Sequence, residues 1–191
     1  MLDFLKAFDR MKPDIAIDKL VKLGINPTVI RLIRSFLSGR AQCVRYRGYM
    51  SPYQQCHIGV PQGTILGPLL WNVYINDLTP HSAKYIKYAD DSTAYHPIMK
   101  TDIEILSSTK QASNISIRDD CLQQAADYAT EWCNANSMLI NATKSNSIIF
   151  SLKKQVNTPP IMINNSAVAD DDTVKLLGVT FDRHLRFNHH V

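Results

Sequence analysis

Long apolar runs are absent from this chain, and none approaches the roughly 18–20 consecutive apolar residues that a bilayer-spanning helix needs. The first residues, Met1-Leu2-Asp3, lack the basic start of a secretory signal peptide. Cysteine is scarce, and none of the four cysteines belongs to a C-x-x-C pair. We therefore expect reduced, buried thiols rather than a zinc site or a dense disulfide framework, and no membrane partner.

Recognisable nucleophile and zinc patterns are also missing. The six histidines are scattered, and neither a Ser–His–Asp nor a Cys–His arrangement can be argued from their spacing. What remains is ordinary for a globular protein: 191 residues, of which 45% are hydrophobic and 20% charged. That length suits one domain, or one domain plus a fragment, and allows a sizeable core.

Acidic residues are missing from one long stretch. Between Lys19 and Asn76 the sequence contains no Asp or Glu, whereas it contains seven basic residues: Lys19, Lys22, Arg31, Arg34, Arg40, Arg45 and Arg47. A polyanionic partner such as nucleic acid would explain this bias. A merely solvated basic surface explains it equally well, and charge alone leaves both interpretations open.

Hydrophobic periodicity and turn residues predict a mixture of helices and strands. The predicted helices are 13–23, 27–37, 66–77 and 119–135. Residues 2–8 are predicted to contain the end of a buried strand. Two strand pairs are predicted, one of 42–47 and 53–58 around a turn at 48–52 and one hairpin of 84–89 and 92–96. A single strand is predicted at 145–150, and a strand or hairpin at 174–181. Residues 97–118 read as a loop and 170–172 as a solvated turn. Because strands and helices do not alternate strictly, we expect the α+β class.

Two adjacent aspartates, Asp90 and Asp91, lie in "IKYADDSTAY" at the expected tip of a hairpin. Burying such a pair would cost several kcal/mol, whereas a hairpin tip can hold both partly solvated. There they suit a hard divalent cation, which prefers oxygen ligands. A third carboxylate should come from another strand, and Asp3 and Asp9 are the candidates. We expect Asp3 to be the ligand and Asp9 to be structural, as a helix cap or the partner of a basic group.

Five blocks in fixed order carry a resemblance to a known family. They are "LDFLKAFDRM", "GVPQGTILGPLLWNVYINDL", "YADDS", "LINATKSNSIIF" and "VKLLGVTFDRHLRF". Together they resemble the palm motifs of reverse transcriptases (RNA-directed DNA polymerases), particularly those of non-LTR, LINE-type retrotransposons. The resemblance implies an antiparallel sheet packed on helices with a ferredoxin-like core. It implies palm at 1–12 and 56–181, fingers elements at 13–55 and the start of a thumb at 182–191.

The resemblance also implies a mechanism and its partners. Asp3, Asp90 and Asp91 resemble the carboxylates that hold two Mg²⁺ ions, which Mn²⁺ can replace, for nucleotidyl transfer to a primer 3′-hydroxyl. Lys144 resembles the lysine that protonates the pyrophosphate leaving group, although a surface lysine explains it equally well. The implied partners are an RNA template, a DNA primer and deoxynucleoside triphosphates. The implied location is the nucleus, and the oligomeric state stays open.

Further residues resemble substrate contacts of the family. Phe8 resembles the aromatic gate under the incoming sugar, with a core phenylalanine as the alternative. Pro61, Gln62 and Gly63 resemble the loop over the nucleotide and template base, with an ordinary strand-to-helix turn as the alternative. Tyr88, beside the aspartates, is the remaining candidate. Gly178 resembles the hairpin that grips the primer end, or is a simple turn glycine.

The family carries a long fingers region before its first motif and a thumb after its last one. We therefore expect this chain to be truncated at both ends, without an endonuclease domain or zinc knuckle. Two hypotheses follow: a polymerase palm, or a remnant that folds and binds nucleic acid weakly. An unrelated phosphotransferase or nuclease would leave four of the five blocks unexplained.

Overall fold

The computed structural model describes residues 1–97, 117–151 and 159–187. The chain divides into two compact units. Unit 1 contains Met1–Phe4, Thr79–Trp132 and Ile140–Val191, and unit 2 contains Leu5–Leu78 and Cys133–Leu139. No helix in the described part is both long and apolar enough to cross a bilayer.

Two helices of unit 2, α2 and α3, begin where proline fixes the first turn. Pro13 and Pro27 stand at the first helical positions of α2 and α3, where their missing N–H groups cost nothing. The Asn26 side chain accepts a hydrogen bond from the Thr28 N–H (2.8 Å) and caps α3. The three helices predicted here are confirmed, with the bounds α2 Pro13–Lys22, α3 Pro27–Leu37 and α4 Leu66–Ile75. A short helix that was not predicted, α1 Ala7–Arg10, precedes them.

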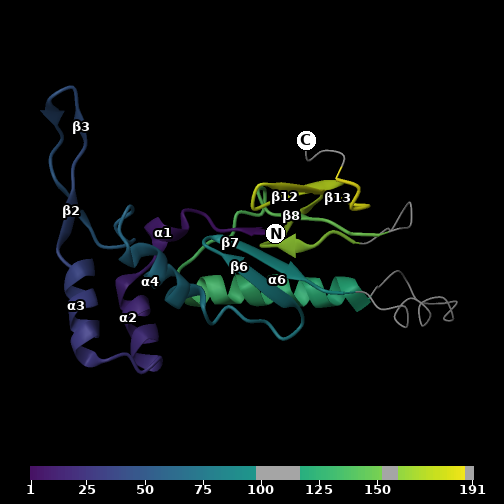
Figure 1. The fold of residues 1–191 in the computed structure, drawn as a ribbon, viewed down its shortest axis with the longest axis horizontal. Coiled ribbons are helices and arrows are strands. Elements are labelled where there is room, and N and C mark those ends of the chain that lie inside the picture. The colour runs from purple at the N-terminus through teal and green to yellow at the C-terminus, as the bar shows by residue number, and fades with distance from the viewer. Residues whose placement is uncertain (98–116, 152–158, 188–191) are drawn as a thin grey trace, which may run out of the picture. The chain divides into compact units, whose positions relative to one another are not determined.

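A narrow two-stranded projection follows α3 (Figure 1), and we call residues 40–56 the ribbon. It consists of two antiparallel pairs, β2 with β5 and β3 with β4. The prediction of two strands around a turn at 48–52 is therefore wrong in detail, because the chain reverses earlier, at Arg47-Gly48. The bounds are β2 Arg40–Gln42, β3 Arg45–Tyr46, β4 Tyr49–Met50 and β5 Gln54–Cys56.

Unit 1 is organised around a three-stranded antiparallel sheet in the order β1-β7-β6. The strands are β1 Leu2–Asp3, β6 Lys84–Tyr88 and β7 Asp91–Tyr95. Helix α6, Ile117–Ala135, begins in unit 1, and there the Tyr85 hydroxyl donates to the Ala125 carbonyl (3.1 Å). The predicted hairpin is confirmed, and the predicted strand within 2–8 shrinks to two residues before α1 begins.

Short strands complete unit 1. The hairpin of β12 and β13 is confirmed, with a two-residue turn at Leu177-Gly178. One short pair, β8 with β11, is parallel, and the predicted strand at 145–150 is only two residues long. The bounds are β8 Asn146–Ser147, β9 Met162–Ile163, β10 Ser166–Ala167, β11 Ala169–Asp170, β12 Thr173–Leu176 and β13 Val179–Asp182. The described architecture is thus mixed, with mainly antiparallel sheets. Most of the loop expected at 97–118 lies outside the described residues.

Large aromatic residues fill the two cores. In unit 1 the Phe4 and Trp132 rings meet edge to face at 6.2 Å, and in unit 2 Trp71 stacks on Tyr74 at the same centroid distance. Both tryptophans are buried. Cys133 is buried too, and burial raises the pKa of its thiol to about 12, so this thiol is unreactive.

One member of the basic stretch is internal. The Lys19 ammonium is buried and bonds to the Asp77 carboxylate and the Tyr74 carbonyl, both at 2.6 Å, while it lies 4.9 Å from the Tyr74 ring centroid. Burial, the larger effect, lowers the pKa of Lys19, and Asp77 partly offsets this. Lys19 therefore serves the fold and contributes no surface charge to a polyanion.

The glycine at the start of the "GVPQG" loop is required by close packing. Its N–H donates to the Met11 carbonyl (2.7 Å), and the next N–H, of Val60, donates to the Phe8 carbonyl (3.0 Å). A Cβ on Gly59 would lie 2.9 Å from the Asp9 carbonyl oxygen. Gly59 thus lets the loop approach α1 closely, whereas Gly63 has open space around it.

We predict that Gly59→Ala destabilises the chain more than Gly63→Ala. Both glycines have left-handed backbones, with φ of 80° and 77°, so each alanine costs roughly 1–2 kcal/mol in conformation. Only Gly59→Ala adds a clash with backbone atoms. Urea unfolding midpoints test this ordering, and equal midpoints would contradict the close approach.

We further predict that Asp77→Ala lowers the free energy of unfolding by roughly 1–3 kcal/mol, because it leaves a buried ammonium without its counter-ion. Asp18→Ala is the control, since Asp18 is exposed on the same helix as Lys19. Lys19→Met should cost less than Asp77→Ala, since it removes the charge itself. The ion pair is unimportant if Asp77→Ala and Asp18→Ala unfold alike.

Candidate active site

Two of the candidate metal ligands are neighbours across a strand pair. In the register of β1 and β7, Asp3 and Asp91 are direct Cα partners, and Leu2 is opposite Ser92. Directly opposed residues of antiparallel strands project on the same face of a sheet. Asp3 and Asp91, which are 88 residues apart in sequence (91 − 3), are thus brought together by a single backbone pairing.

Tyr88 extends this row onto the third strand, because it is the Cα partner of Asp91 in the β6–β7 pair. On this face the alternate residues Ile86 and Tyr88 are exposed, whereas on the other face Ser92 is fully buried and Tyr85 bonds to α6. The row of Asp3, Asp91 and Tyr88 therefore lies on the open face of the sheet. An open face leaves room for a substrate.

Asp90 belongs to the hairpin turn and not to a strand. The turn consists of Ala89 and Asp90, and Asp91 is already the first residue of β7. Ala89 has a φ of 51°, a left-handed conformation that is uncommon for a residue with a Cβ. The expectation that both aspartates form the tip is corrected in this respect. The tight turn keeps Asp90 next to the row without placing it in the row.

The charges of these aspartates reach one another. The pKa of Asp91 is raised, first by partial burial and then by the negative charges of Asp90 and Asp3. Among the described residues, no lysine or arginine forms an ion pair with any of the three. The group therefore carries excess negative charge that a cation from solution would neutralise.

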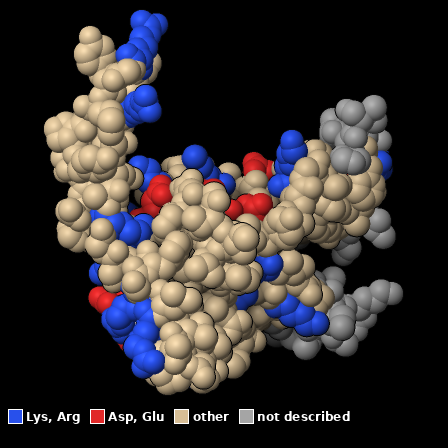
Figure 2. Space-filling view, turned by 60° about the vertical axis from the view of Figure 1, so that its left-hand side comes forward, with Lys and Arg blue, Asp and Glu red and all other residues tan. Residues whose placement is uncertain are grey.

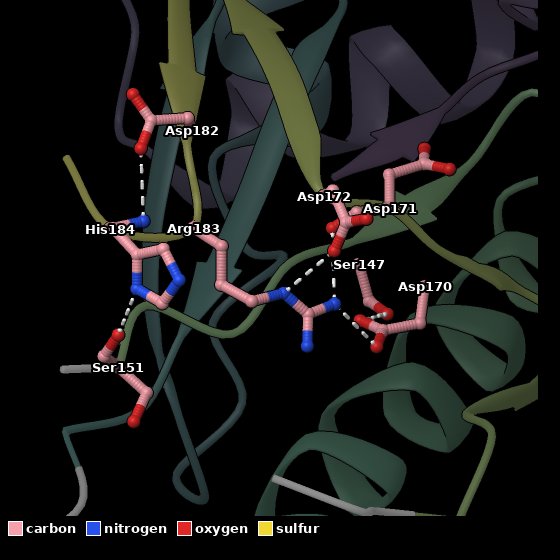
Figure 3. A network of polar contacts seen from close by, with 8 residues as sticks. All are labelled: Ser147, Ser151, Asp170, Asp171, Asp172, Asp182, Arg183 and His184. Carbon is pink, nitrogen blue, oxygen red and sulfur yellow. Dashed lines mark hydrogen bonds and ion pairs between the residues drawn. The ribbon is translucent and has the colours of Figure 1, made fainter. Parts of the chain in front are cut away.

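Another acidic cluster in unit 1 provides a contrast (Figure 3). Arg183 forms ion pairs with Asp170 (3.0 Å) and Asp172 (3.1 Å), and Ser147 donates to Asp170 (3.2 Å). The turn expected to be solvated at 170–172 is largely exposed, and Arg183 pairs with two of its three acids and so offsets part of their charge. This cluster joins β11 to the residue after β13 and is structural.

The turn that carries Lys144 is attached to the backbone of Asp3. The Asn141 N–H donates to the Asp3 carbonyl (2.8 Å), and the Asp3 N–H donates to the Ser145 hydroxyl (3.1 Å). Ser145 is buried, and its hydroxyl also donates to the Asn141 carbonyl (2.9 Å). Lys144 itself is exposed. Sequence reasoning missed Ser145, which gave no signal beyond its place next to Lys144.

The fit of a metal ion to these residues is partial. Carboxylate oxygens are the ligands that Mg²⁺ prefers, and the strand register supplies Asp3 and Asp91 together. Within the described residues, however, no three His, Cys, Asp or Glu side chains are grouped so that they could hold a metal ion. Like charges without a counter-ion repel one another, and this repulsion opposes their convergence.

Two further candidates, Phe8 and the loop at 61–63, lie in unit 2. Phe8 belongs to α1 and not to a strand, and its half-buried ring packs against Trp71 at 5.5 Å. Through this contact one side of the Phe8 ring packs as a core residue would, which supports the alternative that Phe8 is a core phenylalanine. Gly178 belongs to unit 1, at the turn of the β12–β13 hairpin with a φ of 85°.

The "PQGT" turn is ordered by its own hydrogen bonds. Thr64 donates to the Pro61 carbonyl (2.8 Å) and accepts from the Gly67 N–H (3.2 Å). The exposed Gln62 amide donates to the Asp9 carboxylate (2.9 Å). Asp9, expected to cap a helix or pair with a base, instead accepts a hydrogen bond from Gln62. Gln62 and Gly63 are exposed and remain accessible to a ligand.

Comparison with known proteins gives consistent matches over the chain. The family model described as "Reverse transcriptase (RNA-dependent DNA polymerase)" matches residues 1–181. The "Probable RNA-directed DNA polymerase from transposon X-element" of Drosophila melanogaster is 31% identical over 100% of this chain. The "RNA-directed DNA polymerase from mobile element jockey" and the "Probable RNA-directed DNA polymerase from transposon BS" of the same species are 28% and 32% identical.

This chain spans 20% of the length of each of these relatives. The family match covers every block that carries the resemblance, except for the last residues of "VKLLGVTFDRHLRF". On this evidence the chain belongs to the reverse transcriptase family of RNA-dependent DNA polymerases, and these relatives are named as polymerases from a transposon or mobile element.

Proposed function

We propose that this chain forms the catalytic palm of an RNA-directed DNA polymerase, which joins deoxynucleotides to a primer 3′-hydroxyl on an RNA template. The observation that carries the proposal is the pairing of Asp3 with Asp91 across β1 and β7. In this proposal palm elements occupy 1–12 and 56–181, fingers elements 13–55, and the thumb begins at 182–191. A non-LTR element copies itself at chromosomal DNA, which makes the nucleus the proposed location.

Two Mg²⁺ ions are the proposed cofactors, with Asp3, Asp90 and Asp91 as their protein ligands. Bound divalent ions would lower the pKa of the primer hydroxyl and neutralise the triphosphate. The chain's own contribution is placement: the strand register fixes Asp3 beside Asp91, and the tight turn holds Asp90 next to them. Such preorganised charge is the main catalytic device available for phosphoryl transfer.

Other residues would bind and orient the substrates. Lys144, on the turn attached to Asp3, would donate a proton to the pyrophosphate. Tyr88, exposed beside Asp91, would contact the primer or nucleotide. Gln62 and Gly63 would contact the nucleotide and template base, with Pro61 stiffening their loop, and the free side of Phe8 would face the sugar.

We predict that Mg²⁺ raises the melting temperature of the chain by a few degrees. At ten times its Kd a bound ion adds about 1.4 kcal/mol of stability. Asp90→Asn and Asp3→Asn should each remove the shift, because each removes a proposed ligand. Asp14→Asn, which changes an exposed aspartate of unit 2, should keep it. A shift that survives in all three variants would mean that Mg²⁺ binds elsewhere.

We also predict primer extension on an RNA template when this chain is placed between the flanking segments of the X-element relative. Asp91→Asn should lower the rate by more than about 100-fold, because charge stabilisation in the transition state is lost. Extension by the longer polypeptide alone would identify the 191 residues as an incomplete unit. No extension in either form would instead identify a remnant that only folds and binds nucleic acid.

A further inference from the structure

The ribbon of unit 2 buries few of its own side chains, so packing within the fold does not account for them. Every residue from Val44 to Gln55 is exposed, and between the two strand pairs Val44 and Ser51 exchange two hydrogen bonds. An isolated two-stranded ribbon is marginally stable at best in water. Large apolar side chains on it therefore serve something other than a core.

Aromatic rings gather at the outer end of the ribbon. Tyr46 and Tyr49 are Cα partners, so both rings project on the same face. Their exposures are 66% and 83%, and Tyr53, further along the same chain segment, is 67% exposed. Exposed tyrosines present flat faces on which nucleic-acid bases stack, without preference for sequence.

The two-residue turn between Tyr46 and Tyr49 has an unusual residue at its first position. Arg47 and Gly48 both have positive φ, at 47° and 85°, which is the two-residue hairpin turn that normally takes Asn-Gly. An arginine at the first position is strained. Its guanidinium lies over the Tyr46 ring, 5.2 Å from the centroid. Strained residues that persist in a structure cluster where they have a role in binding or catalysis.

The charge of the ribbon is of one sign. It contains Arg40, Arg45 and Arg47 and no acidic residue, and Figure 2 shows basic side chains at the end of the projecting arm. Arg40 is occupied, because it donates to the carbonyls of Leu37, Ile58 and Gly59. Arg45 and Arg47 form none of the ion pairs found among the described residues, so their charges, including that of the Arg47 guanidinium over the Tyr46 ring, are open to an anionic partner. Like charges also oppose pairing of this end with a second copy of itself.

We propose that Arg45, Tyr46, Arg47 and Tyr49 form a binding site for single-stranded nucleic acid, in which bases stack on the tyrosines and the arginines contact phosphates. The site lies in unit 2, whereas the aspartate row lies in unit 1. The choice of nucleic acid over other polyanions rests on the proposed polymerase function. The site itself requires neither metal nor nucleotide.

The test is fluorescence anisotropy with the 191-residue chain and a labelled single strand of about 12 nucleotides, as RNA and as DNA, in EDTA. Arg47→Asn gives the turn its preferred residue, so the ribbon should fold at least as well. It should nevertheless weaken binding and reduce the slope of log K against log salt by about 0.7, which is the loss of one phosphate contact.

Tyr49→Thr keeps a strand-forming residue and removes the ring. It should weaken binding about fivefold or more without changing the salt slope, whereas Tyr49→Phe should bind like the parent. Lys22→Gln is the control for charge, since Lys22 is an exposed residue of α2 in the same unit. It should leave both affinity and slope near the parent values.

The outcomes are distinct. A contact with single strands is supported if Tyr49→Thr loses single-strand affinity and keeps its affinity for heparin. The proposal is overturned if the ribbon variants leave binding unchanged, if Tyr49→Thr loses affinity for heparin and oligonucleotide in parallel, or if the variants change only self-association in size-exclusion chromatography. Binding that depends on the ribbon without any primer extension would overturn the polymerase proposal alone. Equal losses on RNA and DNA identify a backbone- and base-stacking site, and a loss confined to one of them identifies that strand as the ligand.

Discussion

The antiparallel pairing of β1 with β7 is the constraint on which the candidate site depends. It places Asp3 directly opposite Asp91, and a shift of one residue would turn Asp3 to the buried face of the sheet. Leu2, buried on that opposite face, helps to fix the register because a shift would expose it. The 141–145 turn adds a second restraint, since it bonds to both backbone groups of Asp3. The site is thus held by backbone pairing and core packing.

Charge balance distinguishes the two acidic clusters of unit 1. At 170–172 two of the three acids pair with Arg183, which offsets part of their negative charge. At Asp3, Asp90 and Asp91 the described residues supply no such partner, and the raised pKa of Asp91 reflects that imbalance. A protein retains uncompensated like charges at a cost, which is a common feature of functional sites. The excess of basic residues in unit 2 is a similar case, because the internal bonds of Lys19 and Arg40 account for only part of it.

Much of this could be predicted from local signals. Prolines at the first helical turns predicted α2 and α3, and the strand-forming residues of "YIKYADDSTAY" predicted the β6–β7 hairpin. Other features depend on long-range contacts that no local pattern encodes. Gln62 pairs with Asp9, Lys19 is buried against Asp77, and Ser145 supports Asp3. The turn at Arg47-Gly48 was missed because arginine rarely adopts a left-handed backbone, and the strained choice itself then became informative.

The most direct test of the central claim is the position of Mn²⁺, located by its anomalous scattering in crystals of this chain. The account predicts a peak on the open face of the β1–β7–β6 sheet, with carboxylate oxygens of Asp3 and Asp91 both about 2.1 Å away. A peak bound by only one of these aspartates, or by the acids at 170–172, would contradict it. So would a crystal structure in which β1 pairs with β7 in another register.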